Sequence, residues 1–220
     1  MNLFYDAHAH CIESQKGGFL IALEGEPIYE KTYNNIDIYN LNFNSNFIPV
    51  EYITKNFNQT SSQVIKYHAR REKYTRDAII NDIDTRKAKI VIIDTLNTPY
   101  YDYRDYWEIV SSFKNIFFIL AHCGGYDIDD FIKIIDFNRN VYTDFSLTLQ
   151  YFGIVKNNPY IKIMNAMDYM LQNSKINKRI LFGSDNPFYS QKEAYNYYYE
   201  NGYMDLLNNN YLRLCDEADL

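Results

Sequence analysis

The sequence predicts a compact α/β barrel of the (β/α)₈ type with an abbreviated N-terminal half. Eight short, almost continuously apolar runs suit parallel strands that are covered on both faces. Amphipathic segments separate the later runs, as expected of βαβ units. Ionisable residues recur where the runs end, and such barrels collect their active sites at the carboxyl ends of the strands. The 220 residues are expected to form one barrel domain, 1–220, at the small end of the range for this fold.

The order of the elements follows from these runs. The strands are expected at Leu3–Tyr5, Phe19–Leu23, Phe47–Ile53, Val64–Tyr67, Ile90–Ile93, Ile116–Leu120, Val141–Phe145 and Ile180–Phe182. Helical spacing of apolar residues predicts helices over Thr75–Lys87, Tyr103–Phe113, Ile128–Phe137 and Tyr160–Asn173. The link from Ile53 to Val64 is too short for a full helix. Gly17–Tyr33 instead predicts an inserted β-hairpin, with its turn at Glu24-Gly25-Glu26-Pro27.

Composition and charge exclude several classes of protein. A hydrophobic content of 47% and an aromatic content of 17% are typical of a globular chain. The net charge of −6 and the lack of a basic block argue against general nucleic-acid binding. No apolar stretch is long enough to span a membrane, and the first residues do not resemble a signal peptide. The three cysteines have no framework spacing, so a reducing cytoplasm is expected.

The segment Asp6-Ala7-His8-Ala9-His10 places two histidines two residues apart at the end of an apolar run. Side chains alternate along a strand, so His8 and His10 point the same way, roughly 6.6 Å apart at Cα. Two imidazoles at that separation can converge on one metal ion. His122, between an apolar run and Gly124-Gly125, is placed either to face a cavity or to bond loop backbone. Asp185 ends another run and suits a cation ligand, a proton acceptor or a turn cap.

Positive charges gather at the end of a further run, in Lys66-Tyr67-His68-Ala69-Arg70. A buried lysine needs compensation, so Lys66 is expected to meet a carboxylate, an anionic substrate or a metal-bridging group, with Asp94 as a candidate ion-pair partner. Asp144 could line the same mouth or cap its turn. Cys11 and Cys123, each after a histidine, are interpreted as small packing residues.

Together these segments resemble the amidohydrolase superfamily, in the branch of small decarboxylases and hydrolases called amidohydrolase-related. Asp6–His10 looks like its strand-1 Asp-x-His-x-His, and Ala121-His122-Cys123-Gly124-Gly125 looks like its strand-6 His-x-Gly-Gly. Phe182-Gly183-Ser184-Asp185-Asn186-Pro187 is similar to its strand-8 Gly-Ser/Thr-Asp-x-Pro. Lys66–Arg70 resembles a strand-4 Lys-x-His-Pro-Arg, with Ala69 in place of proline.

The resemblance implies a metal-dependent barrel. His8, His10 and Asp185 would bind one divalent metal ion, zinc first, with manganese or iron as alternatives. His122 would be a further ligand or would polarise a substrate carbonyl. Asp185 would take a proton from an activated water. Lys66, His68 and Arg70 would bind a substrate carboxylate or phosphate.

One position departs from the family pattern. Asp94, in Val91-Ile92-Ile93-Asp94-Thr95, stands where members carry a strand-5 metal-binding histidine. Its carboxylate could bind a harder cation such as manganese, or it could pair with Lys66 and leave a weaker site or none.

Four functions remain open from the sequence. The leading one is a metal-dependent hydrolase of an amide, lactone or ester bond in a small polar or anionic substrate. A non-oxidative decarboxylase on the same site, a metal-dependent phosphoesterase and a catalytically inactive binding barrel are the alternatives. The Tyr-rich segment Tyr195–Tyr199 predicts an amphipathic helix that suits either a homodimer interface or packing on the outer ring.

Overall fold

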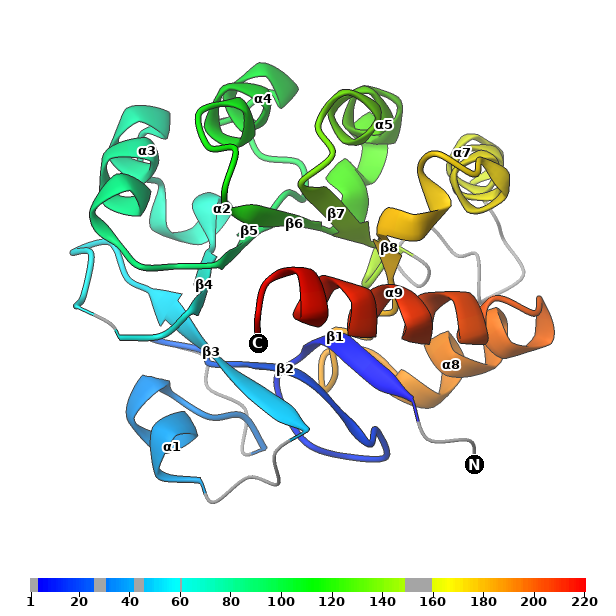
Figure 1. The fold of residues 1–220 in the computed structure, drawn as a ribbon, viewed down its shortest axis with the longest axis horizontal. Helices are drawn as coiled ribbons and strands as arrows, with labels where there is room; N and C mark the ends of the chain where they lie inside the picture. Colours follow the sequence, from blue (N-terminus) through cyan, green and yellow to red (C-terminus); the bar gives the residue numbers. More distant parts are fainter. Residues whose placement is uncertain (1–3, 26–30, 42–45, 60, 149–159) are drawn as a thin grey trace.

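The computed structural model describes residues 4–25, 31–41, 46–59, 61–148 and 160–220. Eight strands form one sheet in which each strand pairs in parallel with the next along the chain (Figure 1). They are β1 (Tyr5–Ala9), β2 (Gly17–Ile21), β3 (Phe47–Ile53), β4 (Val64–Tyr67), β5 (Ile90–Asp94), β6 (Phe117–Ala121), β7 (Val141–Asp144) and β8 (Ile180–Leu181). The predicted (β/α)₈ barrel is confirmed.

The sheet closes through the segment after β8. The amide of Ala7 donates to the carbonyl of Phe182 at 2.8 Å, and the amide of Asp185 donates to the carbonyl of His8 at 2.7 Å. The amide of His10 then donates to the carbonyl of Asn186 at 2.7 Å. The histidine segment and the aspartate segment, at opposite ends of the sequence, are therefore neighbours.

The predicted hairpin over 17–33 is not formed by the described residues. Gly17–Ile21 is instead the second barrel strand, parallel to both β1 and β3. Gly18 makes this close pairing feasible: its φ is +140°, and a Cβ there would lie 1.9 Å from the Asp6 carbonyl oxygen. Part of the predicted turn, residues 26–30, lies outside the described residues.

Helices surround the second half of the barrel more fully than the first. The predicted helices correspond to α3 (Arg76–Thr85), α4 (Tyr103–Ser111), α5 (Ile128–Phe137), α7 (Ile161–Gln172) and α8 (Gln191–Glu200). Three further helices were not predicted: α1 (Asn35–Asn40), α2 (Ala69–Glu72) and α9 (Met204–Glu217). Short 3₁₀ turns follow β6, at His122–Asp127, and precede β8, at Asn177–Arg179. No helix in the described ranges is long and apolar enough to cross a membrane.

Capping side chains explain where several helices begin. The Thr75 side chain accepts from the amide of Ala78 at the start of α3. Asp102 and Asp105 form a reciprocal capping box at the start of α4, and Ser190 accepts from the amide of Glu193 at the start of α8. Such caps satisfy amides that have no partner within the helix.

Two large clusters make up most of the buried core, and a smaller one packs α1 against β2 and β3. One large cluster lies between the strands and the outer helices, and the other large cluster fills the barrel. The inner cluster includes Ile92 and Ile119 of the strands together with Tyr211, Leu214 and Cys215 of α9. Figure 1 shows α9 crossing in front of the strands. The last helix therefore covers the amino-terminal end of the barrel and leaves the carboxyl end for a site.

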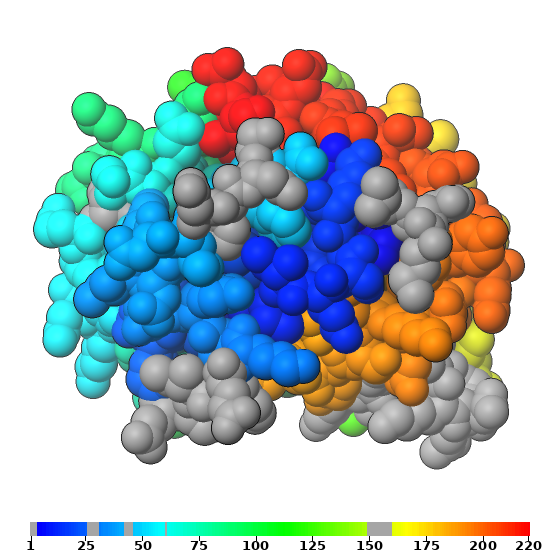
Figure 2. All heavy atoms as spheres, turned by 90° about the horizontal axis from the view of Figure 1, so that it is seen from below, coloured from blue at the N-terminus to red at the C-terminus, as the bar shows by residue number. Residues whose placement is uncertain are grey.

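Helix α8 packs beside β1 rather than projecting from the barrel. The rings of Phe4 and Tyr195 pack in a tilted arrangement with their centroids 4.8 Å apart, and Tyr198 is fully buried. Figure 2 shows the N-terminal segments, in blue, next to α8, in orange. Most of this Tyr-rich surface is thus used within the chain, although Tyr199 remains 56% exposed. A homodimer stays a prediction.

We predict that Gly18→Ala destabilises the barrel by at least 2 kcal/mol, because a side chain at +140° would also collide with β1. Gly202→Ala is the matched control. Its φ is +75° and no atom lies within 4 Å of an added Cβ, so only about 1 kcal/mol of backbone strain is expected. Urea unfolding of both variants measures the difference, and equal losses would contradict this account of β2.

Candidate metal centre

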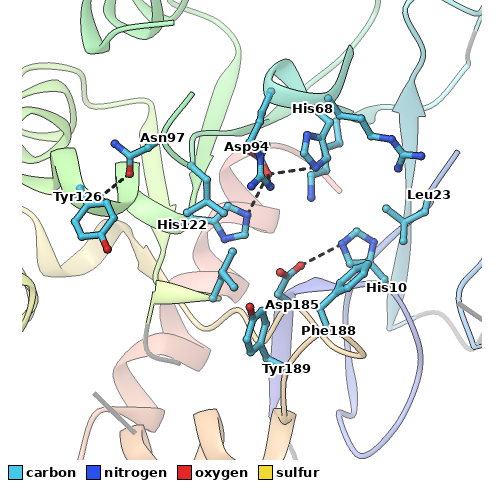
Figure 3. A pocket seen from close by; sticks show the side chains of 15 residues that line it. His10, Leu23, His68, Asp94, Asn97, His122, Tyr126, Asp185, Phe188 and Tyr189 are labelled. Carbon is cyan, nitrogen blue, oxygen red and sulfur yellow. Dashed lines mark hydrogen bonds and ion pairs between the residues drawn. The ribbon is translucent and has the colours of Figure 1, made fainter. Parts of the chain in front are cut away.

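A cavity of about 440 Å³ opens at the carboxyl ends of the strands. Its lining includes seven ionisable residues: His10, Lys66, His68, Arg70, Asp94, His122 and Asp185. Leu23, Leu96, Leu147 and Phe188 add apolar surface, and Figure 3 shows Leu23 and Phe188 beside His10. The structure thus brings together the residues singled out in the sequence. His8, the remaining one, is fully buried beside Asp185.

His10 is oriented by backbone. Its Nδ1 lies 2.9 Å from the carbonyl oxygen of Ile21, which can only accept, so Nδ1 carries the hydrogen. Burial lowers the pKa of His10 to about 4, so the ring is neutral near pH 7. Its Nε2 therefore presents a lone pair toward Asp185 Oδ1, 3.3 Å away (Figure 3). Such backbone bonds are the usual way in which a metal-binding histidine is oriented.

His8 presents its Nε2 to the same oxygen. A β-bulge between Asp6 and Ala9 interrupts the pairing of β1 with β2 around this residue, and bulges re-aim side chains. The His8 Nδ1 lies 3.3 Å from Asp144 Oδ2 and 3.0 Å from Ser146 Oγ. Because the carboxylate only accepts, Nδ1 donates to it, and the Nε2 lone pair lies 3.4 Å from Asp185 Oδ1.

These three acceptor atoms fit a metal ion. His8, His10 and Asp185 form a buried group whose ligand atoms all lie within 4.8 Å of one another. In a tetrahedral site with metal–ligand bonds of about 2.0–2.1 Å, neighbouring ligand atoms are roughly 3.3–3.4 Å apart. The distances to Asp185 Oδ1, 3.3 and 3.4 Å, match that spacing. Lone pairs this close repel one another unless a cation or a proton lies among them.

A second group, His8, His122 and Asp144, is also close enough for an ion. Here, however, the Ser146 hydroxyl lies 3.0 Å from the Nδ1 of both histidines and donates to Asp144 in a short hydrogen bond. The hydroxyl occupies the space between the three side chains. This group is therefore held together by hydrogen bonds, and the first group is the better candidate for a metal.

Asp94 lies in neither group. Its Oδ2 is 3.3 Å from His122 Nε2, 3.4 Å from His68 Nε2 and 3.3 Å from Arg70 Nη2. Figure 3 shows Asp94 between the two imidazoles. All three partners meet Oδ2, whereas the buried Oδ1 has no hydrogen-bond partner. The candidate ion pair with Lys66 is wrong, because the Lys66 Nζ contacts His8 instead. A role of Asp94 as a metal ligand stays a prediction.

The Asp94 carboxylate controls the charge of His122. Burial favours a neutral ring, but Asp94 outweighs it and raises the pKa of His122. The other ring nitrogen faces the Ser146 carbonyl oxygen at 2.9 Å, so both nitrogens meet acceptors and the ring is an imidazolium. Burial likewise opposes ionisation of Asp94, yet His68, His122 and Arg70 hold its pKa well below the usual range.

Lys66 contacts a histidine rather than a carboxylate. Its Nζ is 2.8 Å from His8 Nε2, and its side chain is almost fully buried. Burial lowers the pKa of Lys66, while Asp185, Asp94 and Asp144 oppose that shift at longer range. The lysine therefore stands at the edge of the candidate metal site.

Backbone conformation aims His122 and Asp185 into the cavity. Both adopt positive φ, +69° and +59°, which is rare for residues with side chains and typical of functional sites. The His122 conformation is held by its amide, which donates to Asp144 Oδ1 at 3.2 Å, and by its carbonyl, which accepts from the Thr148 hydroxyl at 2.8 Å. Although burial opposes ionisation, the surrounding imidazoles lower the pKa of Asp185.

Three supporting residues were not assigned a defined role from the sequence. Asp6 accepts four hydrogen bonds beneath the site, and burial raises its pKa to about 7 despite them. Asp144 orients His8, and its neighbour Ser146 touches both His8 and His122. In the sequence, these roles were indicated by the spacing of Asp144 and Ser146, which stand two residues apart at the end of an apolar run. Cys11 and Cys123 are buried and free, as expected of packing residues.

The stability of the metal-free protein is expected to fall in acid partly through His68. Burial lowers the pKa of His68 from 6.5 to about 4, so the unfolded chain binds a proton first. The contribution of neutral His68 to the free energy of unfolding is fully present above pH 6.5 and is lost as the pH falls toward 4. At about 1.4 kcal/mol per unit, wild type should lose on the order of 2 kcal/mol more than His68→Gln between pH 6.5 and 4.5. Urea unfolding measures this, and equal pH slopes would refute it.

Comparison with known proteins supports the fold. No protein-family model and no curated protein matches this chain. An uncharacterized TIM-barrel protein from Bordetella bronchiseptica superposes with a TM-score of 0.66 at 17% identity, over 94% of this chain and 80% of that one. An amidohydrolase from Burkholderia multivorans superposes with a TM-score of 0.62 at 11% identity, over 99% of both chains. The predicted resemblance to amidohydrolases is therefore confirmed at the level of the fold.

Proposed function

We propose that this protein is a metal-dependent hydrolase of a small polar or anionic molecule, acting on an amide, lactone or ester bond. The proposal depends above all on the acceptor atoms of His8, His10 and Asp185: both imidazole nitrogens lie at tetrahedral spacing from Asp185 Oδ1, and all three atoms lie within 4.8 Å of one another. The shared fold with an amidohydrolase is consistent with it.

The donor set suits zinc, with manganese and iron as alternatives. Two imidazole nitrogens and one carboxylate oxygen are a common catalytic zinc set that leaves a further position open. When bound, a divalent cation lowers the pKa of water and polarises a carbonyl oxygen. Asp185 would accept the proton released during attack. His122, kept protonated by Asp94, would polarise the substrate carbonyl.

The substrate's anionic group is assigned to Lys66, His68 and Arg70. All three line the cavity. Arg70 supplies a permanent positive charge, and Lys66 and the neutral ring of His68 supply further N–H donors, a combination that suits carboxylate and phosphate groups. Arg70 is the most accessible, with 42% of its side chain exposed. The apolar residues that line the same cavity would hold the rest of a small molecule.

Removal of the proposed ligands tests the metal. Purified wild type is expected to contain about one equivalent of zinc, manganese or iron, and the double variant His8→Ala/His10→Ala should contain none, because two of three ligands are lost. His68→Ala, which removes a cavity histidine outside the ligand group, is the matched control and should retain the ion. Elemental analysis of the folded proteins measures this.

Catalysis is tested on the same proteins. A chromogenic panel of amides, lactones and phosphate esters, with carbon dioxide release from aromatic acids alongside, separates a hydrolase from a phosphoesterase and a decarboxylase. Activity that requires both the ion and the two histidines supports the proposal. A wild type that contains no metal and hydrolyses nothing would favour an inactive binding barrel.

Arg70→Met is predicted to raise KM for anionic substrates by roughly tenfold or more, the effect of losing one charge-assisted hydrogen bond, with kcat little changed. Arg139→Met, at an exposed position away from the cavity, is the control. Steady-state kinetics on a charged substrate and its neutral ester measure the change. An equal effect on both substrates would show that Arg70 does not bind the anion.

A further inference from the structure

Lys66 and the proposed metal ion need the same atom. The lysine reaches the site from β4, and its Nζ lies 2.8 Å from His8 Nε2. The same Nε2 lies 3.4 Å from Asp185 Oδ1 and is one of the three proposed ligand atoms. A hydrogen bond from Lys66 and a bond to an ion therefore converge on one nitrogen.

That nitrogen has a single lone pair. The other ring nitrogen of His8 donates to the carboxylate of Asp144 at 3.3 Å, which fixes the hydrogen on Nδ1 and the lone pair on Nε2. An ammonium and a neutral amine both have N–H bonds to donate, so Lys66 uses this lone pair in either protonation state. Binding of an ion to His8 must break the contact with Lys66.

We propose that Lys66 is a built-in competitor of the metal ion, which occupies His8 in the metal-free protein and lowers the affinity of the site. This inference rests on the proposed metal-dependent function. Lys66 is 2% exposed, so its Nζ has little access to water in place of His8. In the metal-free protein the lysine thus gives the buried Nε2 of His8 a hydrogen-bond donor. Metal binding exchanges this donor for the ion, and the ion is held reversibly.

The competition predicts two opposite effects of one substitution. Lys66→Met keeps a side chain of similar length and removes the donor. The metal-free variant should melt at a lower temperature than wild type, because the buried Nε2 of His8 loses its hydrogen-bond donor. The same variant should bind Zn²⁺ at least tenfold more tightly, because no hydrogen bond has to be broken. A purely structural lysine would not increase affinity when removed.

The experiment is a calorimetric titration of chelator-treated protein with Zn²⁺. It compares wild type, Lys66→Met and Arg70→Met, which removes a cavity cation that has no contact with His8. The expected result is tight binding by Lys66→Met and a change of less than about threefold for Arg70→Met. Equal or weaker binding by folded Lys66→Met would overturn the proposal, and weaker binding would make the lysine a supporter of the ion.

Two further outcomes separate this inference from the proposed function. If wild type binds Zn²⁺ and Lys66→Met binds it no better, the competition fails while the metal site stands. If neither binds Zn²⁺, both fail. Should Lys66→Met not fold, a crystal structure of Zn²⁺-loaded wild type decides: Lys66 Nζ must have left His8 Nε2, and an Nζ that stays 2.8 Å from a metal-bound His8 overturns the proposal.

Discussion

The Asp6 carboxylate holds the two ends of the candidate site together. Its Oδ1 accepts from the amides of His8 and Ser184, both at 3.1 Å, and its Oδ2 accepts from Ser184 Oγ at 2.6 Å and Gln191 Nε2 at 2.8 Å. His8 lies two residues from Asp6 in the sequence, whereas Ser184 and Gln191 lie almost the whole chain away. Because a buried charge is stable only when it is well bonded, the same contacts that satisfy Asp6 also fix His8 beside Asp185.

The cavity combines opposite charges in a small, buried volume. Lys66 and the His122 imidazolium face the carboxylates of Asp94, Asp144 and Asp185, and each carboxylate has an imidazole within 3.4 Å. At short range and low dielectric such pairs are strong, but each depends on the others for its ionisation. This mutual dependence keeps Asp94 and His122 ionised together inside the barrel.

Much of the fold could be predicted because its strands are continuous apolar runs. Phe47–Ile53 and Val64–Tyr67 occur within the predicted limits. The first strand was placed too early: β1 begins at Tyr5 and includes Asp6 and His8, polar residues that interrupt an apolar pattern but are satisfied by partners distant in sequence. The second strand was predicted at Phe19–Leu23, but the surrounding residues 17–33 were assigned to a hairpin, whereas β2 begins at Gly17 and pairs in parallel with both of its neighbours.

The site could be predicted as a set of residues but not as a set of contacts. The histidines and Asp185 could be predicted to lie together because each stands at the end of a strand, and the carboxyl ends of parallel strands lie at one edge of the barrel. Which cation meets which acceptor depends on side-chain reach and on loop backbone. The sequence therefore did not distinguish Asp94 bound by His68 and His122 from Asp94 bound by Lys66. Ser146 carries no recognisable motif, and its role depends on two imidazoles that meet only in the folded chain.

Helix α9 limits how small molecules and ions can enter and leave the barrel. Tyr211, Leu214 and Cys215 pack into the inner core at the amino-terminal end, while the cavity opens at the other end. In the part of the chain that the structure describes, entry and departure thus share one opening. A molecule bound in the cavity beside Arg70 would block the way out for anything bound deeper in the barrel. An ion at His8 and His10 would then be able to leave only after that molecule had gone.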